Sequence, residues 1–124
     1  MNRLFPRKDL LGVPVSVTTY AEIVEAVVEA ARAPRPLTVI AMDVHCLSRA
    51  SRDAEFRGIV ESMDIVTPDG QSLRWGLNLI HKAGLRDRVA GPDLTLHLCE
   101  RAAVEGIPVY FHGSEERVVA ALAR

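Results

Sequence analysis

Short apolar runs alternate with segments of helical apolar spacing along the whole chain. The Val-rich segment 11–17, interrupted by Pro14, predicts an edge strand or the arm of a hairpin. Continuous apolar runs at 37–42, 65–66 and 107–111 predict three interior strands. Strands that alternate with helices favour an α/β fold, a Rossmann-like parallel sheet flanked by helices with right-handed crossovers.

The first helix is predicted to begin at a capping box. In Thr19-Tyr20-Ala21-Glu22, the hydroxyl and the glutamate lie at the spacing that satisfies the first backbone N–H groups of a helix. One face of this helix is apolar and carries Ile23, Val24, Val27, Val28 and Ala31. Pro34 and Pro36 end it.

Four further stretches have helical spacing. Residues 44–62 predict two short helices divided near Asp53, whose carboxylate can cap the second. Residues 71–80 are apolar over most of the helix circumference, with Leu73, Leu77 and Ile80 on one face and Trp75 and Leu79 on another, so this helix is buried or awaits a partner. A basic loop, 81–88, precedes a helix that Gly106 stops, and Glu115 and Glu116 suit the start of a last helix.

Composition narrows the class of protein. The chain has 124 residues, 48% of them hydrophobic and 25% charged, which indicates one globular domain or part of one. Its formal net charge of -1 argues against a nucleic-acid partner. Cys46 and Cys99 are too few and too far apart for a disulfide framework or a zinc site. The chain shows no secretory signal and no run of the roughly 18 to 20 apolar residues of a membrane span, so we expect a cytoplasmic protein.

The strongest candidate for chemistry is Asp69, at the end of the predicted strand 65–66. In an open α/β sheet, ligands bind in the crevice at the carboxyl ends of the strands. The sequence Thr67-Pro68-Asp69-Gly70 places a carboxylate there between a stiff proline and a permissive glycine. The alternative is structural, since an aspartate in this position can also cap the helix that follows.

Five segments in order resemble the WecG/TagA/CpsF glycosyltransferases. They are Leu11-Gly12-Val13-Pro14-Val15, Val39-Ile40-Ala41-Met42-Asp43, Thr67-Pro68-Asp69-Gly70, Arg88-Val89-Ala90-Gly91-Pro92-Asp93-Leu94 and Gly106-Ile107-Pro108-Val109-Tyr110-Phe111-His112-Gly113. A lone Pro-Asp-Gly is an ordinary turn sequence. Its combination with Arg-Val-x-Gly-x-Asp-Leu about twenty residues later is specific, and the resemblance extends over nearly the whole chain.

The resemblance implies a Rossmann-type enzyme that moves a sugar, commonly of the N-acetylmannosamine type, from a UDP donor to a polyprenyl-diphosphate-linked acceptor. The resemblance also implies a role in the synthesis of teichoic acid, enterobacterial antigen or exopolysaccharide, at the inner face of the plasma membrane. Asp69 matches the family's proposed general base and Arg88 an arginine of the same pocket. Gly70, Gly91 and Asp93 match the two motifs, and Gly113 matches the glycine turn of the second half.

The sequence departs from the family pattern in two places. The family has Thr-x-Asn where this chain has Ala41-Met42-Asp43, which puts donor or acceptor binding in doubt. The family also continues past the equivalent of Arg124, with a Pro-Lys-Gln-Glu type motif and a membrane-associating segment. We therefore expect 1–124 to be a single but incomplete domain, and the alternative to an enzyme is a non-catalytic remnant or binding module.

The remaining candidate residues have structural alternatives. Arg88 offers a forked cation for a phosphate, or is a solvated loop charge. Asp43 at a strand end can bind ligand, although capping the helix at Val44 is favoured, and Asp93 is expected to cap the helix at Leu94. Gly113 and Ser114 before the last helix can receive a phosphate or form an ordinary tight turn.

No cofactor or metal is expected. None of the four histidines has ligand spacing, and the chain has no Asp-x-Asp pair of the kind that holds a divalent metal on a diphosphate, which favours a metal-independent transfer. We expect this transfer to invert the sugar, with Asp69 as the base. An open sheet edge and uncovered apolar helix faces favour self-association, so we expect a homo-oligomer.

Overall fold

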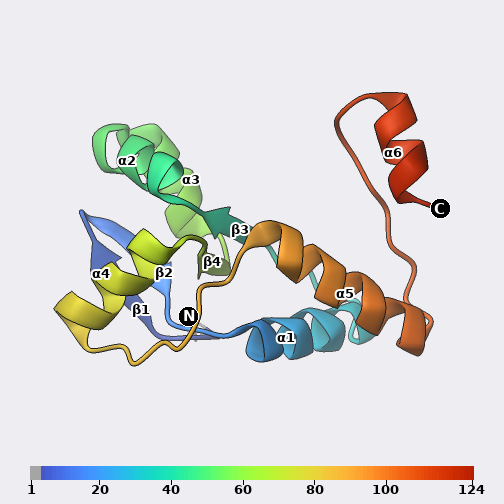
Figure 1. Cartoon of the computed structure of the whole chain (residues 1–124), viewed down its shortest axis with the longest axis horizontal. Helices are drawn as coiled ribbons and strands as arrows, with labels where there is room; N and C mark the ends of the chain where they lie inside the picture. Colours follow the sequence, from blue (N-terminus) through green and yellow to red (C-terminus); the bar gives the residue numbers. More distant parts are fainter. Residues whose placement is uncertain (1–3) are drawn as a thin grey trace.

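Two pairs of short strands lie among six helices in the computed structural model, which describes residues 4–124 (Figure 1). Strands β1 (Arg7–Leu10) and β2 (Val13–Ser16) form an antiparallel hairpin. Strands β3 (Val39–Met42) and β4 (Ile65–Pro68) pair in parallel. A parallel pair among helices confirms the α/β class, with a smaller sheet than the sequence predicts.

The helices begin and end close to the predicted positions. They are α1 (Tyr20–Arg32), α2 (Val44–Arg52), α3 (Ala54–Ser62), α4 (Gln71–His81), α5 (Gly91–Glu105) and α6 (Glu116–Leu122). The capping box is confirmed, because the Thr19 hydroxyl accepts a hydrogen bond from the Glu22 backbone N–H at 3.3 Å. The break at Asp53 is confirmed as well, since its carboxylate accepts from the Phe56 N–H at 3.0 Å.

Strand β4 is the best-enclosed strand among the described residues. All four of its residues are buried, with β3 paired on one side. On its other side lies β2, whose buried Ser16 hydroxyl accepts a hydrogen bond from the Val66 N–H at 3.0 Å. The prediction that β3 is buried on both faces is wrong: its first three residues are half-buried and Met42 alone is fully buried. Among the described strands β3 pairs with β4 alone, so it is an edge strand.

The core consists of two clusters. One joins the β1–β2 hairpin to α2, α3 and α4 around Val15, Met42, Val66 and Leu77. The other joins α1 and α5 to the start of β4 around Ile23, Val28, Ile65 and Leu94. Strand β4 contributes to both clusters, through Val66 and Ile65, so its position is fixed from two directions.

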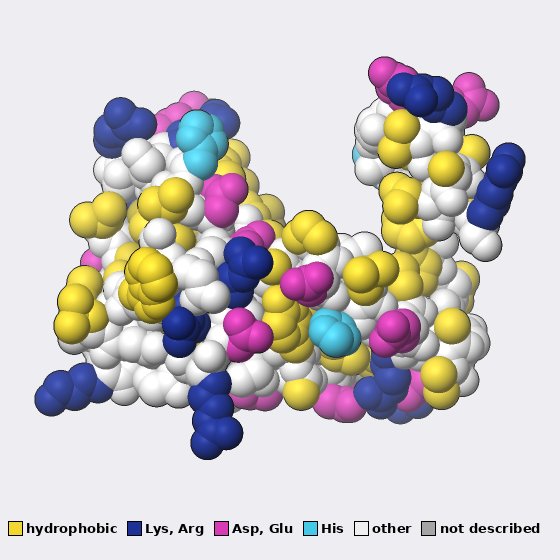
Figure 2. Space-filling model, viewed as in Figure 1, with side chains coloured by type: hydrophobic (Ala, Val, Ile, Leu, Met, Phe, Trp, Pro, Cys, Tyr) yellow, Lys and Arg dark blue, Asp and Glu magenta, His cyan; other side chains and the backbone are white. Residues whose placement is uncertain are grey.

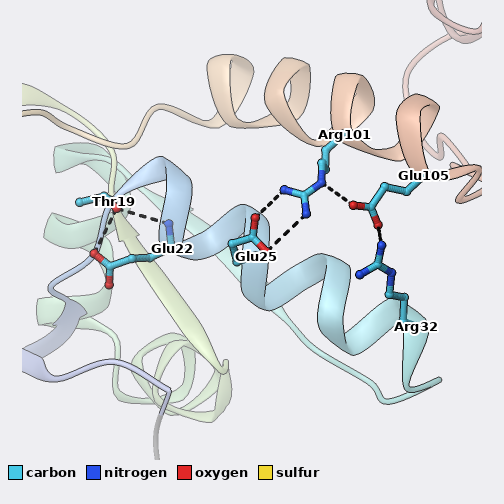
Figure 3. A network of polar contacts seen from close by, with 6 residues as sticks. All are labelled: Thr19, Glu22, Glu25, Arg32, Arg101 and Glu105. Atoms are coloured by element: carbon cyan, nitrogen blue, oxygen red, sulfur yellow. Dashed lines mark hydrogen bonds and ion pairs between the residues drawn. The ribbon is translucent and has the colours of Figure 1, made fainter.

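Helices α1 and α5 lie side by side and are joined by a network of charges (Figures 1 and 3). The Arg101 guanidinium binds Glu25 on α1 and, at 2.7 Å, Glu105 on its own helix, and Arg32 pairs with Glu105. Hydrogen bonding to Arg101 lowers the pKa of the Glu25 carboxyl. The network holds α5 in register with α1 near the end opposite to Gly91.

Three expectations about the apolar pattern are wrong. Residues 107–111 form no strand, because no other strand of the described chain lies beside them. Ala30 is buried on α1 and Ala31 is exposed. On α4, Ile80 does not share the buried face of Leu73 and Leu77 but is exposed together with Trp75 and Leu79, since the core ends before this last turn.

Candidate functional site

The carboxyl ends of β3 and β4 meet at one edge of the sheet. Met42 lies opposite Pro68 in the parallel register, so Asp43 and Asp69 follow the two strands at adjacent positions. The Asp69 N–H donates to the Met42 carbonyl oxygen at 3.0 Å, which extends the pairing by one step. The edge that the sequence predicts as a ligand crevice therefore carries two carboxylates on neighbouring backbones.

The Asp69 carboxylate is held by the start of α5. Its Oδ2 accepts a hydrogen bond from the backbone N–H of Gly91, the first residue of that helix, at 3.1 Å. The alternative that Asp69 caps the following helix is wrong, because Gly70 is the N-cap of α4 and no side chain caps it. Within residues 4–124, Oδ1 accepts no hydrogen bond, and Asp69 is half-buried. One oxygen is therefore anchored, and the other has no hydrogen-bond partner in this range.

Glycine is required on both sides of this contact. Gly70 has φ +118°, a conformation that strains any residue with a Cβ, and it turns the chain from β4 into α4. At Gly91 the reason is space, since an added Cβ would lie 3.2 Å from the Ala41 Cβ and 3.6 Å from Asp69 Oδ2. Gly70 therefore acts through its backbone conformation, whereas Gly91 lets the start of α5 approach β3 and the Asp69 carboxylate.

The segment before α5 is fixed to β4 by hydrogen bonds. The Val89 N–H donates to the Pro68 carbonyl at 3.0 Å, and the buried Thr67 hydroxyl donates to the Val89 carbonyl at 3.2 Å. The Ala90 N–H donates to the Tyr20 hydroxyl at 2.8 Å. The sequence gives no signal for these roles of Thr67 and Tyr20, because each partner is a backbone group many residues away.

A groove of about 600 Å³ lies between this segment, α5 and the starts of α1 and α4. Its lining combines one guanidinium, one amide, three carboxylates and two rings, from Tyr20, Gln71, Asp87, Arg88, Asp93, Leu96, His97 and Glu100. The ring centroids of Tyr20 and His97 are 5.1 Å apart. The structure thus brings Arg88 and Asp93 into one groove, where a cation can meet a phosphate and carboxylates can bind hydroxyl groups.

Asp43 and Asp93 both lie at the start of a helix, but only Asp43 caps its helix. Asp43 caps α2 as predicted, its Oδ1 accepting from the Cys46 N–H at 2.8 Å, and this bond lowers the pKa of its carboxyl. Burial raises the pKa of the Cys46 thiol. The expected cap by Asp93 is wrong, because α5 begins earlier, with Ala90 as its N-cap. Asp93 lies in the first turn, where a carboxylate complements the helix dipole.

The turn at Gly113 and Ser114, which the sequence suggests for a donor phosphate, lies away from the end of β4. Gly113 and Ser114 follow the far end of α5, in the exposed connection to α6, which stands apart from the sheet (Figure 1). Both have positive φ, +112° and +57°. The structure therefore does not bring this turn to the edge where Asp43 and Asp69 lie.

Among residues 4–124, no helix combines the length and apolarity needed to cross a bilayer. In the same range, no three His, Cys, Asp or Glu side chains gather as they would around a metal ion.

The chain matches a known protein family over most of its length. The model of the glycosyl transferase WecG/TagA/CpsF family matches residues 8–124, which is almost the entire chain. The matched range contains the carboxyl ends of β3 and β4, the start of α5 and the groove.

Proposed function

Because the chain belongs to the glycosyl transferase WecG/TagA/CpsF family, we propose that it moves an N-acetylmannosamine-type sugar from a UDP donor to a polyprenyl-diphosphate-linked acceptor. The family indicates sugar transfer in general, and the choice of donor and acceptor, in cell-surface polysaccharide synthesis, is our proposal. The observation that carries it is the Asp69 carboxylate at the carboxyl end of β4, with Oδ2 bound by the Gly91 N–H and Oδ1 open.

Asp69 is the proposed general base. The acceptor hydroxyl attacks the anomeric carbon while its proton passes to Asp69 Oδ1, and the bond between that carbon and the UDP oxygen breaks with its electron pair leaving on UDP. Attack from the face opposite to the leaving group inverts the anomeric centre. The anchored Oδ2 keeps the carboxylate from rotating, so Oδ1 stays aimed at the reactant.

Arg88 is the proposed cation for the departing diphosphate. It lines the same groove as Asp93, and a guanidinium matches phosphate oxygens with two parallel hydrogen bonds. Charge that develops on the leaving group is then balanced by the protein itself, in a metal-independent reaction. The carboxylates and the amide of the same groove are suited to sugar hydroxyls.

A lipid-linked acceptor requires a surface that meets the membrane, and we propose the outer face of α4. Trp75 and Leu79 are 60% and 85% exposed there, and Lys82 follows at the end of the helix. Figure 2 shows apolar side chains over α4 with cationic side chains below them. Trp75 is the chain's only tryptophan, so its emission should shift to the blue with anionic vesicles. An unchanged spectrum at saturating lipid contradicts this orientation.

Replacing the base tests the function directly. Asp69→Asn keeps an oxygen for the Gly91 N–H but cannot take a proton, so transfer from UDP-sugar to lipid-diphosphate acceptor should fall about 100- to 10,000-fold with the fold intact. Asp53→Asn is the matched control, because it makes the same change at a helix cap and should leave the rate unchanged. Transfer by Asp69→Asn at a rate near the parent's excludes the base assignment.

A non-catalytic binding module is the second candidate, favoured by the position of Gly113 and Ser114 away from the edge. Titration with UDP in a calorimeter separates the candidates. An enzyme of the proposed kind should release or absorb heat and gain thermal stability with millimolar UDP, and a module without a donor site should show neither.

A further inference from the structure

We propose that Tyr20 is a positioning residue for Asp69, acting through the two peptide N–H groups at the start of α5. This inference rests on the proposed function, because it assigns Tyr20 a part in the same transfer reaction. Tyr20 lies 49 residues before Asp69 in the sequence, at the first position of α1, and is not part of the motifs that point to the site.

Two successive N–H groups link the tyrosine to the base. The Ala90 N–H donates to the Tyr20 hydroxyl at 2.8 Å, and the next N–H, of Gly91, donates to Asp69 Oδ2 at 3.1 Å. Ala90 is the N-cap of α5, and alanine has no side chain that could fix this end of the helix. The Tyr20 hydroxyl therefore orients the peptide unit whose neighbour holds the carboxylate.

The hydrogen bond between the Ala90 N–H and the Tyr20 hydroxyl is largely shielded from water. Ala90 is 6% exposed, so water cannot readily replace the hydroxyl as a partner for its N–H. A buried N–H without a partner is costly, and the start of α5 would shift to recover one. Gly91 has little room to shift toward β3, because a Cβ at its position would lie 3.2 Å from the Ala41 Cβ. A shift in another direction would alter its hydrogen bond to Asp69 Oδ2.

Tyr20 is itself held rigidly. The capping box at Thr19 fixes the backbone that carries it, and its ring packs against His97 on α5. The charges of Arg101, Glu25 and Glu105 join the same two helices further along (Figure 3). Since α1 and α5 are joined at both places, the tyrosine has a constant position relative to Gly91.

Removal of the hydroxyl alone tests the proposal. Tyr20→Phe keeps the ring and its contact with His97, so we expect kcat for sugar transfer to fall about tenfold while KM for both substrates stays within about twofold. The matched control is Tyr110→Phe, the same change at the chain's other tyrosine, which is 87% exposed and should leave both constants unchanged. A kcat for Tyr20→Phe equal to the parent's overturns the proposal.

A second measurement is independent of catalysis. In the ¹⁵N-labelled chain, Tyr20→Phe should speed hydrogen exchange of the Ala90 and Gly91 amides at least about tenfold, while Tyr110→Phe should not. Unchanged exchange at Gly91 overturns the positioning role even if Asp69→Asn is inactive. Faster exchange at Gly91 together with an active Asp69→Asn would instead remove the base assignment and leave the structural link in place.

Discussion

Strand β4 and the segment 107–111 are both short apolar runs that contain a proline, but the first is a buried strand and the second forms no strand. All four residues of β4 are buried, whereas Val109 and Tyr110 are 50% and 87% exposed. The difference lies in backbone partners. Strand β4 exchanges hydrogen bonds with β3, with Ser16 and with the segment before α5, while the 107–111 run has no strand beside it within residues 4–124.

This comparison explains where the candidate site lies. At the end of β4, the backbone of Asp69 is bound to β3 and its carboxylate to the start of α5, which the Tyr20 hydroxyl of α1 holds in turn. The turn at Gly113 and Ser114 has suitable residue types for a phosphate, but it follows a run without such neighbours. The end of β4 and the turn at Gly113 and Ser114 therefore differ more in their backbone hydrogen-bond partners than in their residue types.

The largest expected effect compares the same substitution in both regions. Val66→Ala removes two buried carbon atoms from β4 and should lower the free energy of unfolding by about 2–3 kcal/mol, the sum of lost burial and an unfilled cavity. Val109→Ala should change it by less than about 0.5 kcal/mol. Urea denaturation of both variants gives the two values. Equal losses would show that the 107–111 run is as enclosed as β4.

A smaller effect is expected at two helix starts, that of α2, which follows β3, and that of α6, which follows the 107–111 run. Asp43→Ala removes the cap of α2 and should cost about 1 kcal/mol at pH 7, while Glu115→Ala at the uncapped start of α6 should cost almost nothing. The folded pKa of Asp43 is lowered from its ordinary 3.8, so the cap's stabilisation is present above that pH and is lost as pH falls through the folded pKa.

Denaturation curves from pH 7 to pH 2 check that sign. The difference between the parent and Asp43→Ala should be constant at neutral pH and shrink below about pH 4. A difference that grows on acidification contradicts the cap assignment.

The smallest effect is expected from the charged network. Arg101→Ala breaks the contacts with Glu25 and Glu105 and should lower the urea midpoint less than Asp43→Ala does, by an amount that decreases with added salt. Arg117→Ala removes an exposed ion pair near α6 and should leave the midpoint unchanged. A salt-independent loss in Arg101→Ala would mean that packing of its side chain, rather than its charge, joins α1 to α5.

Features that depend on near neighbours could be predicted from the sequence. The capping box at Thr19, the break at Asp53 and the stop at Gly106 are each decided within about four residues, and all three are confirmed. Strand β1 was missed because Arg7, Lys8 and Asp9 give it no apolar run, and only pairing with β2 makes it a strand.

Features that depend on distant backbone could not be predicted. The sequence places Asp69 at a strand end, but the group that holds it, the Gly91 N–H, lies 22 residues later. In the sequence Tyr20 is recognisable only as part of a capping box, because its hydrogen-bond partner, the Ala90 N–H, lies 70 residues later. The 107–111 run has the apolar residues of a strand although Pro108 interrupts it, and among the described strands none lies beside it.

Mapping of UDP binding onto the backbone amides tests the central claim that the site lies at the carboxyl end of β4. In a titration of the ¹⁵N-labelled chain followed by NMR, we predict the largest shift changes at the amides of Gly70, residues 88–91 and Asp93, around Asp69 and the groove. Changes confined to Gly113 and Ser114 would contradict the claim and move the site to the exposed turn.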